Sequence, residues 1–310
     1  MDLFHLPPSA RANVDLYRYT GIASAYQNWV KPSGVSMVFM VTIAGGGGGG
    51  AGFPSAVSGS GGGGGGACSG ISRFLCPAAF LPDELYIQVG NGGLGGVPGV
   101  SSGNASPGVN SFILTSKTAV LPNIICYSGV NAPGGGGGGA TAAAGAAGTV
   151  PTIAVTQPVN ALGEWLTIVG LVGAIGGVGA VGTAVTCWAA IPLSPGSGGA
   201  GVTAADFAGG AQTATAVLEL GAMGSIPVAA GGVALGGNTS GAPHGSSGRN
   251  MWKPFLHSGG AGGAGIITGG AVGGDGGVGG IGCGGGGGGA GTTGGKGGHG
   301  GNGMVMIVSW

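Results

Sequence analysis

The chain alternates between short apolar runs and long glycine-rich stretches. Residues 35–43, Val-Ser-Met-Val-Phe-Met-Val-Thr-Ile, form an apolar run rich in β-branched residues that stops at a glycine block, which predicts a buried strand. Similar runs predict further strands at residues 85–89, 111–115, 123–127 and 304–310. The last run is as apolar as the others, so we expect it to return along the glycine-rich body and pair with the N-terminal sheet.

The glycine-rich stretches contain an identical internal repeat. The heptapeptide Gly-Gly-Gly-Gly-Gly-Gly-Ala begins at Gly45, Gly61, Gly134 and Gly284. Flexible linkers also contain oligoglycine, but usually beside serine and other polar residues, whereas these blocks adjoin apolar runs. The repeat therefore favours backbone segments that pack where a Cβ atom would not fit.

From residue 259 onward the glycines also follow a period of three. Residues 259–264, 273–281 and 294–302 repeat two glycines and one other residue. Three residues per turn is the period of the polyproline II helix, and two of the three faces of such a glycine helix are bare. The sequence therefore predicts an all-β module combined with a polyglycine II helix sandwich, with essentially no α-helix outside the N-terminal arm.

The N-terminal segment differs chemically from the rest of the chain. Residues 1–32 hold five of the sixteen charged residues together with Tyr17, Tyr19, Tyr26 and Trp29. We expect an attachment arm, formed by a short helix or an extended segment, that docks onto another protein through these four aromatic residues. The alternative is that the segment caps the core.

The remainder of the chain is expected to divide into three parts. Residues 33–133 are predicted to form the β-strand module with glycine insertions, and residues 134–303 the polyglycine II lattice with exposed loops. Residues 304–310 then form the strand that returns to the β module.

Composition narrows the class of protein. Glycine accounts for 84 of the 310 residues, and charged residues for 5% with no net charge. A nucleic-acid-binding protein needs clustered cations to neutralise phosphates, so we expect no nucleic-acid partner. Disordered chains are poor in apolar residues, whereas this chain is 43% hydrophobic. Collagen needs abundant proline and a glycine at every third position, and the glycine runs do not fit that rule.

The sequence contains few of the residue groupings that catalysis requires. The five cysteines lack the paired spacing of a zinc site and predict reduced, buried side chains. The four histidines adjoin no cluster of carboxylates or cysteines, and the many Gly-x-Gly-x-x-Gly matches lack the helix and acidic residue of a dinucleotide site. We therefore expect no enzymatic activity, no cofactor and no metal site.

The middle of the chain is unusually apolar. Residues 165–205 contain no formally charged side chain, and the stretch 165–193 is long enough to cross a bilayer. Its glycine content and its lack of basic flanks favour a core or interface segment, with membrane activity as the alternative. The first residues lack the features of a signal peptide, so we expect synthesis in a cytosol.

The best candidates for recognition are aromatic and basic residues in glycine-rich surroundings. Residues 249–257, Arg-Asn-Met-Trp-Lys-Pro-Phe-Leu-His, combine the residue types that dominate binding hot spots. The alternative is that Trp252 and Phe255 close the edge of the core. Asp206-Phe207 and Glu219 mark two further candidate loops. The predicted receptor-binding residues are Arg249, Trp252, Phe255, His257 and Phe207.

Two motifs carry a resemblance to a known family. One is Trp-Val-Lys-Pro-Ser-Gly-Val-Ser-Met-Val-Phe-Met-Val-Thr-Ile-Ala at residues 29–44 followed by six glycines. The other is the glycine-rich stretch 282–303, which ends on the apolar run 304–310. From about residue 29 onward the chain resembles the glycine-rich virion proteins of tailed bacteriophages, in particular the tail-fibre-tip adhesins built on a sandwich of polyglycine II helices.

The resemblance implies a function in the virion. In the adhesins the glycine lattice is a rigid stalk, loops at its distal end bind host outer-membrane proteins or surface glycans, and an N-terminal portion attaches to the fibre. It implies that residues 1–31 contact other virion proteins and that the protein is assembled into virions in the host cytoplasm.

The β module and the apolar middle depart from the adhesin pattern. They favour the alternative of a structural virion protein without receptor binding, such as a capsid decoration, a minor capsid protein or a tail component. The sequence leaves open whether the chain forms a homo-oligomer.

Overall fold

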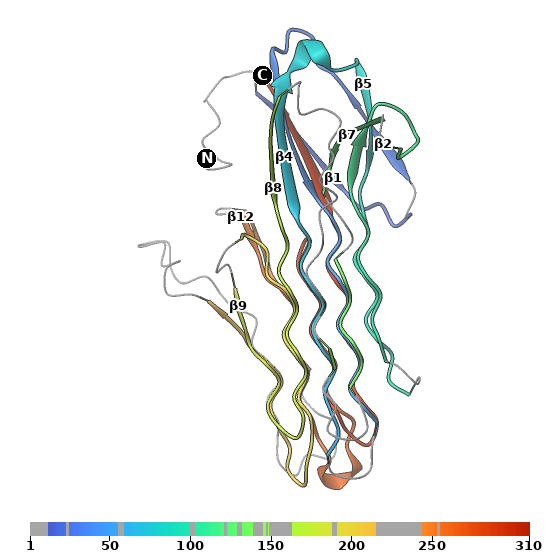
Figure 1. Cartoon of the computed structure of the whole chain (residues 1–310), viewed down its shortest axis with the longest axis vertical. Helices are drawn as coiled ribbons and strands as arrows, with labels where there is room; N and C mark the ends of the chain where they lie inside the picture. The colour runs from blue at the N-terminus through green and yellow to red at the C-terminus, as the bar shows by residue number, and fades with distance from the viewer. Residues whose placement is uncertain are drawn as a thin grey trace.

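The molecule is elongated, with β-sheets at one end and a bundle of glycine-rich segments below them (Figure 1). The computed structural model describes residues 12–22, 25–54, 59–99, 103–120, 123–128, 132–138, 145–146, 148, 163–187, 191–214, 244–252 and 255–310. These residues form strands, irregular extended segments and the short 3-10 turns η1 (Ala78–Phe80) and η5 (Thr268–Gly270), without an α-helix. The predicted all-β class is confirmed.

Two antiparallel sheets form the end that we call the head. Within the described residues, one sheet has the strand order β1 (Asn13–Arg18), β13 (Met304–Ser309), β3 (Met37–Ile43), β4 (Ile71–Pro77) and β8 (Glu164–Ile168). The other has the order β2 (Tyr26–Val30), β5 (Glu84–Gln88), β6 (Phe112–Leu114) and β7 (Ile124–Tyr127). The C-terminal strand β13 lies between β1 and β3.

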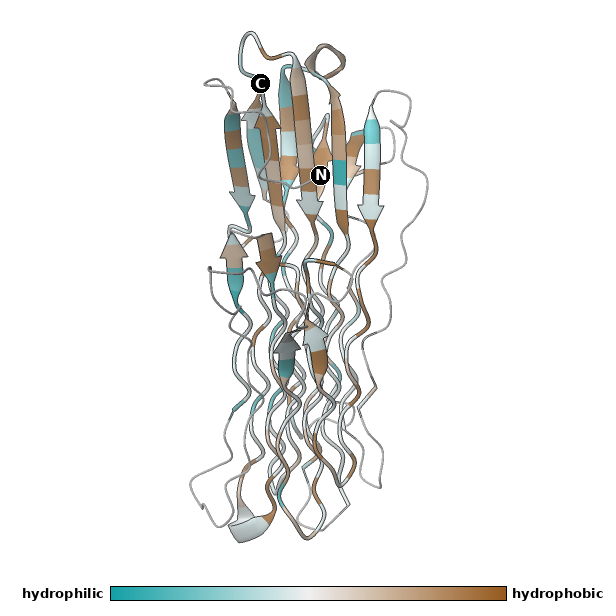
Figure 2. Ribbon diagram, turned by 90° about the vertical axis from the view of Figure 1, so that its left-hand side faces the viewer, coloured by the Kyte–Doolittle hydropathy of each residue, from teal (hydrophilic) through white to brown (hydrophobic). Residues whose placement is uncertain are grey.

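Apolar side chains join the two sheets into a sandwich. Val38 and Met40 of β3 belong to the same buried cluster as Leu85 and Ile87 of β5, and all four are fully buried. Strand residues alternate between the two faces of a sheet, so every second residue of β3 points into this core. Figure 2 shows that the apolar strands are concentrated in the head.

A hairpin covers part of the opposite face of the five-stranded sheet. Strands β11 (Asn250–Trp252) and β12 (Phe255–His257) pair antiparallel, and Phe255 packs in a second buried cluster with Val41 and Ile43 of β3. A further short pair, β9 (Val185–Cys187) and β10 (Gln212–Ala214), is parallel. All five cysteines are free and buried, as their sequence spacing predicts.

The described part of the predicted attachment arm belongs to the head. Strand β1 pairs with β13, with Asn13 opposite Ser309, and β2 pairs with β5, with Trp29 opposite Leu85. Residues 12–22 and 25–32 thus contribute an edge strand to each sheet. Of the two expected forms, they adopt the extended one and not the short helix. Residues 1–11 lie outside the described residues.

Strands of the head continue directly into the glycine-rich segments that we call the body. Strand β3 runs into residues 44–53, and residues 294–303 lead into β13. Every backbone N–H from Gly45 to Phe53 donates to a carbonyl oxygen of another segment, at N···O distances of 2.7 to 3.1 Å. The acceptors repeat every three residues. Gly45, Gly46 and Gly47 donate to three different neighbouring segments, and Gly48 donates to the same segment as Gly45.

The same segment also accepts hydrogen bonds from further neighbours. The carbonyls of Gly46 and Gly49 accept from residues 93 and 96, while those of Gly47 and Gly50 accept from residues 285 and 288. Those of Gly48 and Ala51 accept from a third segment, at residues 135 and 138. The backbone of residues 45–53 is therefore bonded on all sides.

Contacts of this kind explain why the repeats consist of glycine. A Cβ atom on Gly47, Gly48 or Gly49 would overlap a backbone carbonyl oxygen of a different neighbour in each case, on Pro133, Leu94 and Gly286 respectively. No side chain fits at these three positions. Glycine is thus required at most positions of a surrounded segment, and the segments 45–51, 61–67 and 284–290, each of which ends in an alanine, are buried throughout.

Segments with one residue other than glycine in three lie at the surface. In residues 294–302 the side chains of Lys296, His299 and Asn302 are exposed while the intervening glycines are buried. The period-three pattern therefore marks a segment with one solvent-facing side. Residues 134–140 begin as such a partly exposed segment, although they repeat the heptapeptide of the buried ones, and residues 139–140 lie outside the described residues.

The apolar middle of the chain forms the edge of the head and one flank of the body. Strand β8 is the last strand of its sheet within the described residues, and residues 171–177 donate and accept hydrogen bonds along residues 62–68 and 196–199. Among the described residues there is no helix of the length and hydropathy needed to cross a membrane.

We predict that a single methyl group in a surrounded segment destabilises the protein strongly. The Cβ atom of a Gly287→Ala variant would overlap the Gly63 carbonyl oxygen and lie 2.7 Å from the Gly199 nitrogen, and neither backbone can retreat without breaking its own bonds. We expect the free energy of unfolding to fall by about 2 to 3 kcal/mol or more, measured by denaturant unfolding. Lys296→Ala, on an exposed face, should change it by less than about 0.5 kcal/mol; equal effects would contradict this account.

Candidate functional site

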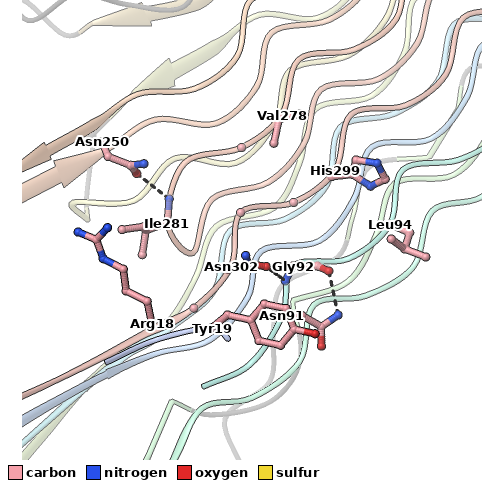
Figure 3. Close-up of a pocket in the computed structure, with 14 residues that line it drawn as sticks. Arg18, Tyr19, Asn91, Gly92, Leu94, Asn250, Val278, Ile281, His299 and Asn302 are labelled. Carbon is pink, nitrogen blue, oxygen red and sulfur yellow. Dashed lines mark hydrogen bonds between the residues drawn. The ribbon is translucent and has the colours of Figure 1, made fainter. Parts of the chain in front are cut away.

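A groove opens at the junction of the head and the body. Its volume is about 600 Å³, and its described walls come from the end of β1, the start of β11 and three glycine-rich segments at residues 91–94, 278–281 and 299–303. Figure 3 shows its side chains projecting from these separate segments toward a common space. The groove therefore exists only because segments distant in sequence pack side by side.

The period of three determines which side chains face the groove. Its body-derived side chains come in pairs three residues apart, namely Asn91 with Leu94, Val278 with Ile281, and His299 with Asn302. Arg18 and Tyr19 at the end of β1 and Asn250 of β11 complete the lining. No carboxylate is found among the described residues that line the groove, and Arg18 supplies their formal positive charge.

An aromatic cluster lies beside the groove in the β11–β12 hairpin. The ring centroids of Trp252, Phe255 and His257 are 4.6 to 5.9 Å apart, and all three pairs meet edge to face. The guanidinium carbon of Arg18 lies 5.4 Å from the Trp252 ring centroid, within the range of a cation–π interaction. Arg18 thus connects β1 to the hairpin.

Burial changes the titration of His257. Its side chain is fully buried, and desolvation lowers its pKa from 6.5 to about 4 because a charged imidazolium is disfavoured in an apolar environment. The ring is therefore neutral at pH 7 and acts as part of the core.

The structure separates the predicted receptor-binding residues into two places. Arg249 is exposed and Trp252 partly buried at the junction, whereas Phe255 and His257 are buried and do not present their rings to a partner. Phe207 pairs with Gly265 near η5, at the end of the body opposite the head (Figure 1). It is not brought together with the other four.

The loop around Phe207 is held by its acidic neighbour. The Asp206 carboxylate accepts hydrogen bonds from the backbone N–H groups of Ile267 (2.9 Å) and Thr268 (3.3 Å) and from the Thr268 hydroxyl. These bonds join two turns at the tip of the body. Glu219, the other candidate loop residue, lies outside the described residues.

The predicted attachment residues have different environments. Trp29 is 2% exposed and its Nε1–H donates to the Asp15 carboxylate at 2.9 Å. Tyr17 packs against the same core, and burial, followed by the charge of Asp15, raises its pKa to about 12. Tyr26 packs against a separate cluster with Tyr127. Of the four, Tyr19 alone lines the groove.

The described residues offer little for metal or nucleophilic chemistry. They contain no group of three histidine, cysteine, aspartate or glutamate side chains that could hold a metal ion. Burial raises the pKa of the Cys68 and Cys126 thiols to about 12, so both stay protonated at neutral pH and lack the nucleophilicity of a thiolate.

Comparison of the chain with protein-family models and with curated proteins gives no match. The function is therefore inferred from the geometry of the groove, the body and its tip.

Sequence reasoning missed most of the groove. It selected mostly aromatic residues, of which Tyr19 alone lines the groove. The other described lining side chains are three asparagines, three aliphatic residues, one arginine and one histidine. The available signal was the period of three, because His299 and Asn302 stand at the positions that glycine helices would expose. Their proximity to Asn91 and Asn250 depends on packing between segments, which the local pattern does not encode.

We predict that His257 makes the protein less stable in mild acid. Because folding lowers its pKa, the unfolded chain binds the proton more tightly, so stability is full above about pH 6.5 and falls as the pH drops toward 4. Between pH 7 and pH 5 this residue should cost about 2 kcal/mol. In denaturant titrations a His257→Gln variant should lose less stability than the wild type over this interval. If the two proteins lost the same amount of stability, His257 would not be the residue responsible for the acid sensitivity.

Proposed function

We propose that the protein is a bacteriophage virion surface protein, a tail-fibre or tail-tip adhesin that binds a host-cell surface receptor through loops on a rigid scaffold of polyglycine II helices. The receptor is an outer-membrane protein or a surface glycan of the host. Residues 1–31, of which 12–22 and 25–31 belong to the head, are the part that attaches to other virion proteins.

The repeat of hydrogen-bond partners every three residues supports polyglycine II helices. Three successive N–H groups of residues 45–53 donate to three different neighbouring segments before the pattern repeats, as expected for a helix with three residues per turn. The overlap of any added Cβ atom with neighbouring carbonyls is the second feature expected of such a lattice.

The observation that carries the adhesin proposal is the position of the turns at the end of a stiff body. The body is cross-linked by backbone hydrogen bonds in several directions, so it cannot bend without breaking many of them at once. At its far end the Asp206 carboxylate ties the Phe207 turn to the turn of η5. A stiff rod with ordered turns at the tip holds a binding surface away from the particle that carries it.

The edges of the head support the attachment role. Strand β1 is an edge strand of its sheet within the described residues and exposes Val14 and Leu16 (59% and 39%). Edge strands with unpaired backbone groups readily pair with other chains. This edge is the natural surface for contact with a virion component.

We predict that cell binding depends on one end of the body. Purified protein should bind cells of its host saturably, and Phe207→Ala should weaken that binding if the tip is the contact surface, because an aromatic anchor contributes on the order of 2 kcal/mol or more. If the junction is the contact surface instead, Arg249→Ala should weaken the binding. Lys296→Ala, between the two, is the control and should bind normally. Binding is measured by flow cytometry with labelled protein.

The outcomes separate the two surfaces. Loss of binding in one variant and not in the other assigns the receptor contact to that end. A wild-type protein that binds no cell from a panel of candidate hosts, while it is recovered within particles, would overturn the adhesin proposal.

A structural virion protein is the second candidate, favoured by an exposed apolar row. The row follows β8 and the segment after it, at intervals of three residues from Leu166 to Ile175 and of six from there to Val181. The exposed fractions are 43 to 56% for Leu166, Val169, Val172, Ile175 and Val181. Contiguous apolar surface of this kind is typical of subunit interfaces. It would bury well against a neighbouring virion subunit or a second copy.

For this second candidate we predict self-association through the row. Ile175→Lys should convert an oligomer to a monomer in sedimentation velocity, because a charge would be buried in an apolar contact. Val97→Lys is the matched control, since Val97 is 54% exposed against 53% for Ile175 and lies on a different segment. A wild type that remains monomeric at high concentration would argue against a homo-oligomer formed through this row.

A further inference from the structure

We propose that the groove between head and body binds a saccharide that carries a carboxylate group. The proposal rests on the adhesin function to the extent that such a sugar belongs to a host surface glycan. The groove's volume of about 600 Å³ lies within the range of small-molecule sites. Its side chains, backbone and charge each restrict the chemistry of the ligand.

Two asparagines present their amino groups as donors. The Asn302 Oδ1 atom accepts from the Gly92 N–H at 2.9 Å, and the Asn250 Oδ1 atom accepts from the Ile281 N–H at 2.7 Å. Because both carbonyl oxygens are used by the backbone, the orientation of each amide is fixed. The Nδ2 groups of these exposed side chains remain for a ligand (Figure 3).

The histidine of the groove is fixed in the same manner. The Nδ1 atom of His299 accepts from the Gly95 N–H at 3.1 Å, so the neutral ring carries its proton on Nε2. The exposed face of His299 is therefore also a hydrogen-bond donor. Three of the four lining side chains that could offer either an acceptor or a donor thus offer donors. The fourth, Asn91, donates its amino group to the Gly92 carbonyl at 3.1 Å and offers its Oδ1 atom as an acceptor, which suits a sugar hydroxyl.

Arg18 adds a positive charge that no carboxylate of the described residues pairs with. Its guanidinium lies over the Trp252 ring, and no carboxylate of the described residues forms an ion pair with it. The planar guanidinium group recognises a carboxylate through two parallel hydrogen bonds. A donor-rich groove with one such cation and no lining carboxylate favours an anionic ligand.

The glycine backbone of the groove is used within the protein. The N–H groups of Gly92, Gly300, Gly301 and Gly303 donate to acceptors of the chain itself. These glycines therefore offer no donors to a ligand, and recognition falls to the outward-facing residues between them.

Apolar surface beside the donors fits a sugar ring. Tyr19 contributes an aromatic ring, and Leu94 and Val278 contribute exposed aliphatic groups (61% and 42%). A pyranose has an apolar C–H face and polar edges, so it can rest against these groups while its hydroxyl and carboxylate oxygens accept hydrogen bonds. Together the lining groups match a uronic-acid or sialic-acid type of monosaccharide.

The test compares acidic sugars with their neutral methyl esters. Full-length protein is titrated by isothermal calorimetry with glucuronic, galacturonic and N-acetylneuraminic acids and with the methyl ester of each. We expect at least one acid to bind more tightly than its ester by on the order of tenfold, the effect of one charge-assisted hydrogen bond. An Asp- and Glu-containing peptide serves as the competing ligand class.

Two variants place the ligand in the groove. Asn302→Asp keeps an oxygen to accept the Gly92 N–H but replaces the amino donor with a negative charge, so it should lower affinity for the acid more than for the ester. Arg18→Gln should reduce the preference for the acid by about tenfold. Lys296→Ala, three residues from His299 along the same segment, removes a positive charge outside the groove lining and should leave the preference unchanged.

The results distinguish this inference from the adhesin proposal. Binding of an acidic sugar that depends on Arg18 supports the groove assignment even if no host cell is bound, in which case the adhesin proposal fails alone. Saturable cell binding without any acidic-sugar binding overturns the groove assignment and leaves the adhesin proposal intact. Equal affinity for acid and ester, or tighter Arg18-dependent binding of the peptide, also overturns it.

Discussion

The backbone hydrogen bond between closely packed glycine segments is the interaction on which the structure depends. Ordering one residue costs about 1 to 2 kcal/mol of conformational entropy, and glycine lies at the high end. A single backbone hydrogen bond returns only about 0.5 to 1.5 kcal/mol. A glycine segment therefore gains order only where many bonds form together, as they do along residues 45–53. The close approach that permits these bonds leaves no room for a Cβ atom at most of the glycine positions of the body.

This constraint places the conventional hydrophobic core in the head. Since the surrounded segments bury only glycine and an occasional alanine, the head supplies most of the apolar area, through buried residues such as Met40, Phe74 and Ile87. Its strands enter the body without a break, so the register fixed by pairs such as Ile43 with Met304 also fixes where each glycine segment starts. The sandwich thus aligns the bundle, and folding of the two parts is coupled.

Local sequence was sufficient for elements whose signal is local. The run 35–43 predicted the strand now seen as β3, and the run 304–310 predicted β13. Strand β1 escaped prediction because only its pairing with β13, at the other end of the chain, makes it a strand. The distance between Phe207 and the hairpin residues was equally hidden, since sequence does not say at which end of the body a loop emerges. Asn91 and Asn302 meet in the groove through packing alone.

The same reasoning explains why a groove forms at the junction and not along the body. In the body every segment presents the same period of three, so the surface side chains form parallel rows with buried glycines between them. In the head the period is two, and a residue such as Tyr19 lies where β1 ends and no glycine segment continues it among the described residues. Side chains spaced by two residues and by three residues therefore meet at the junction of head and body. There Arg18 and Asn250 stand at the ends of the rows that contain Asn302 and Asn91, and the surface becomes concave.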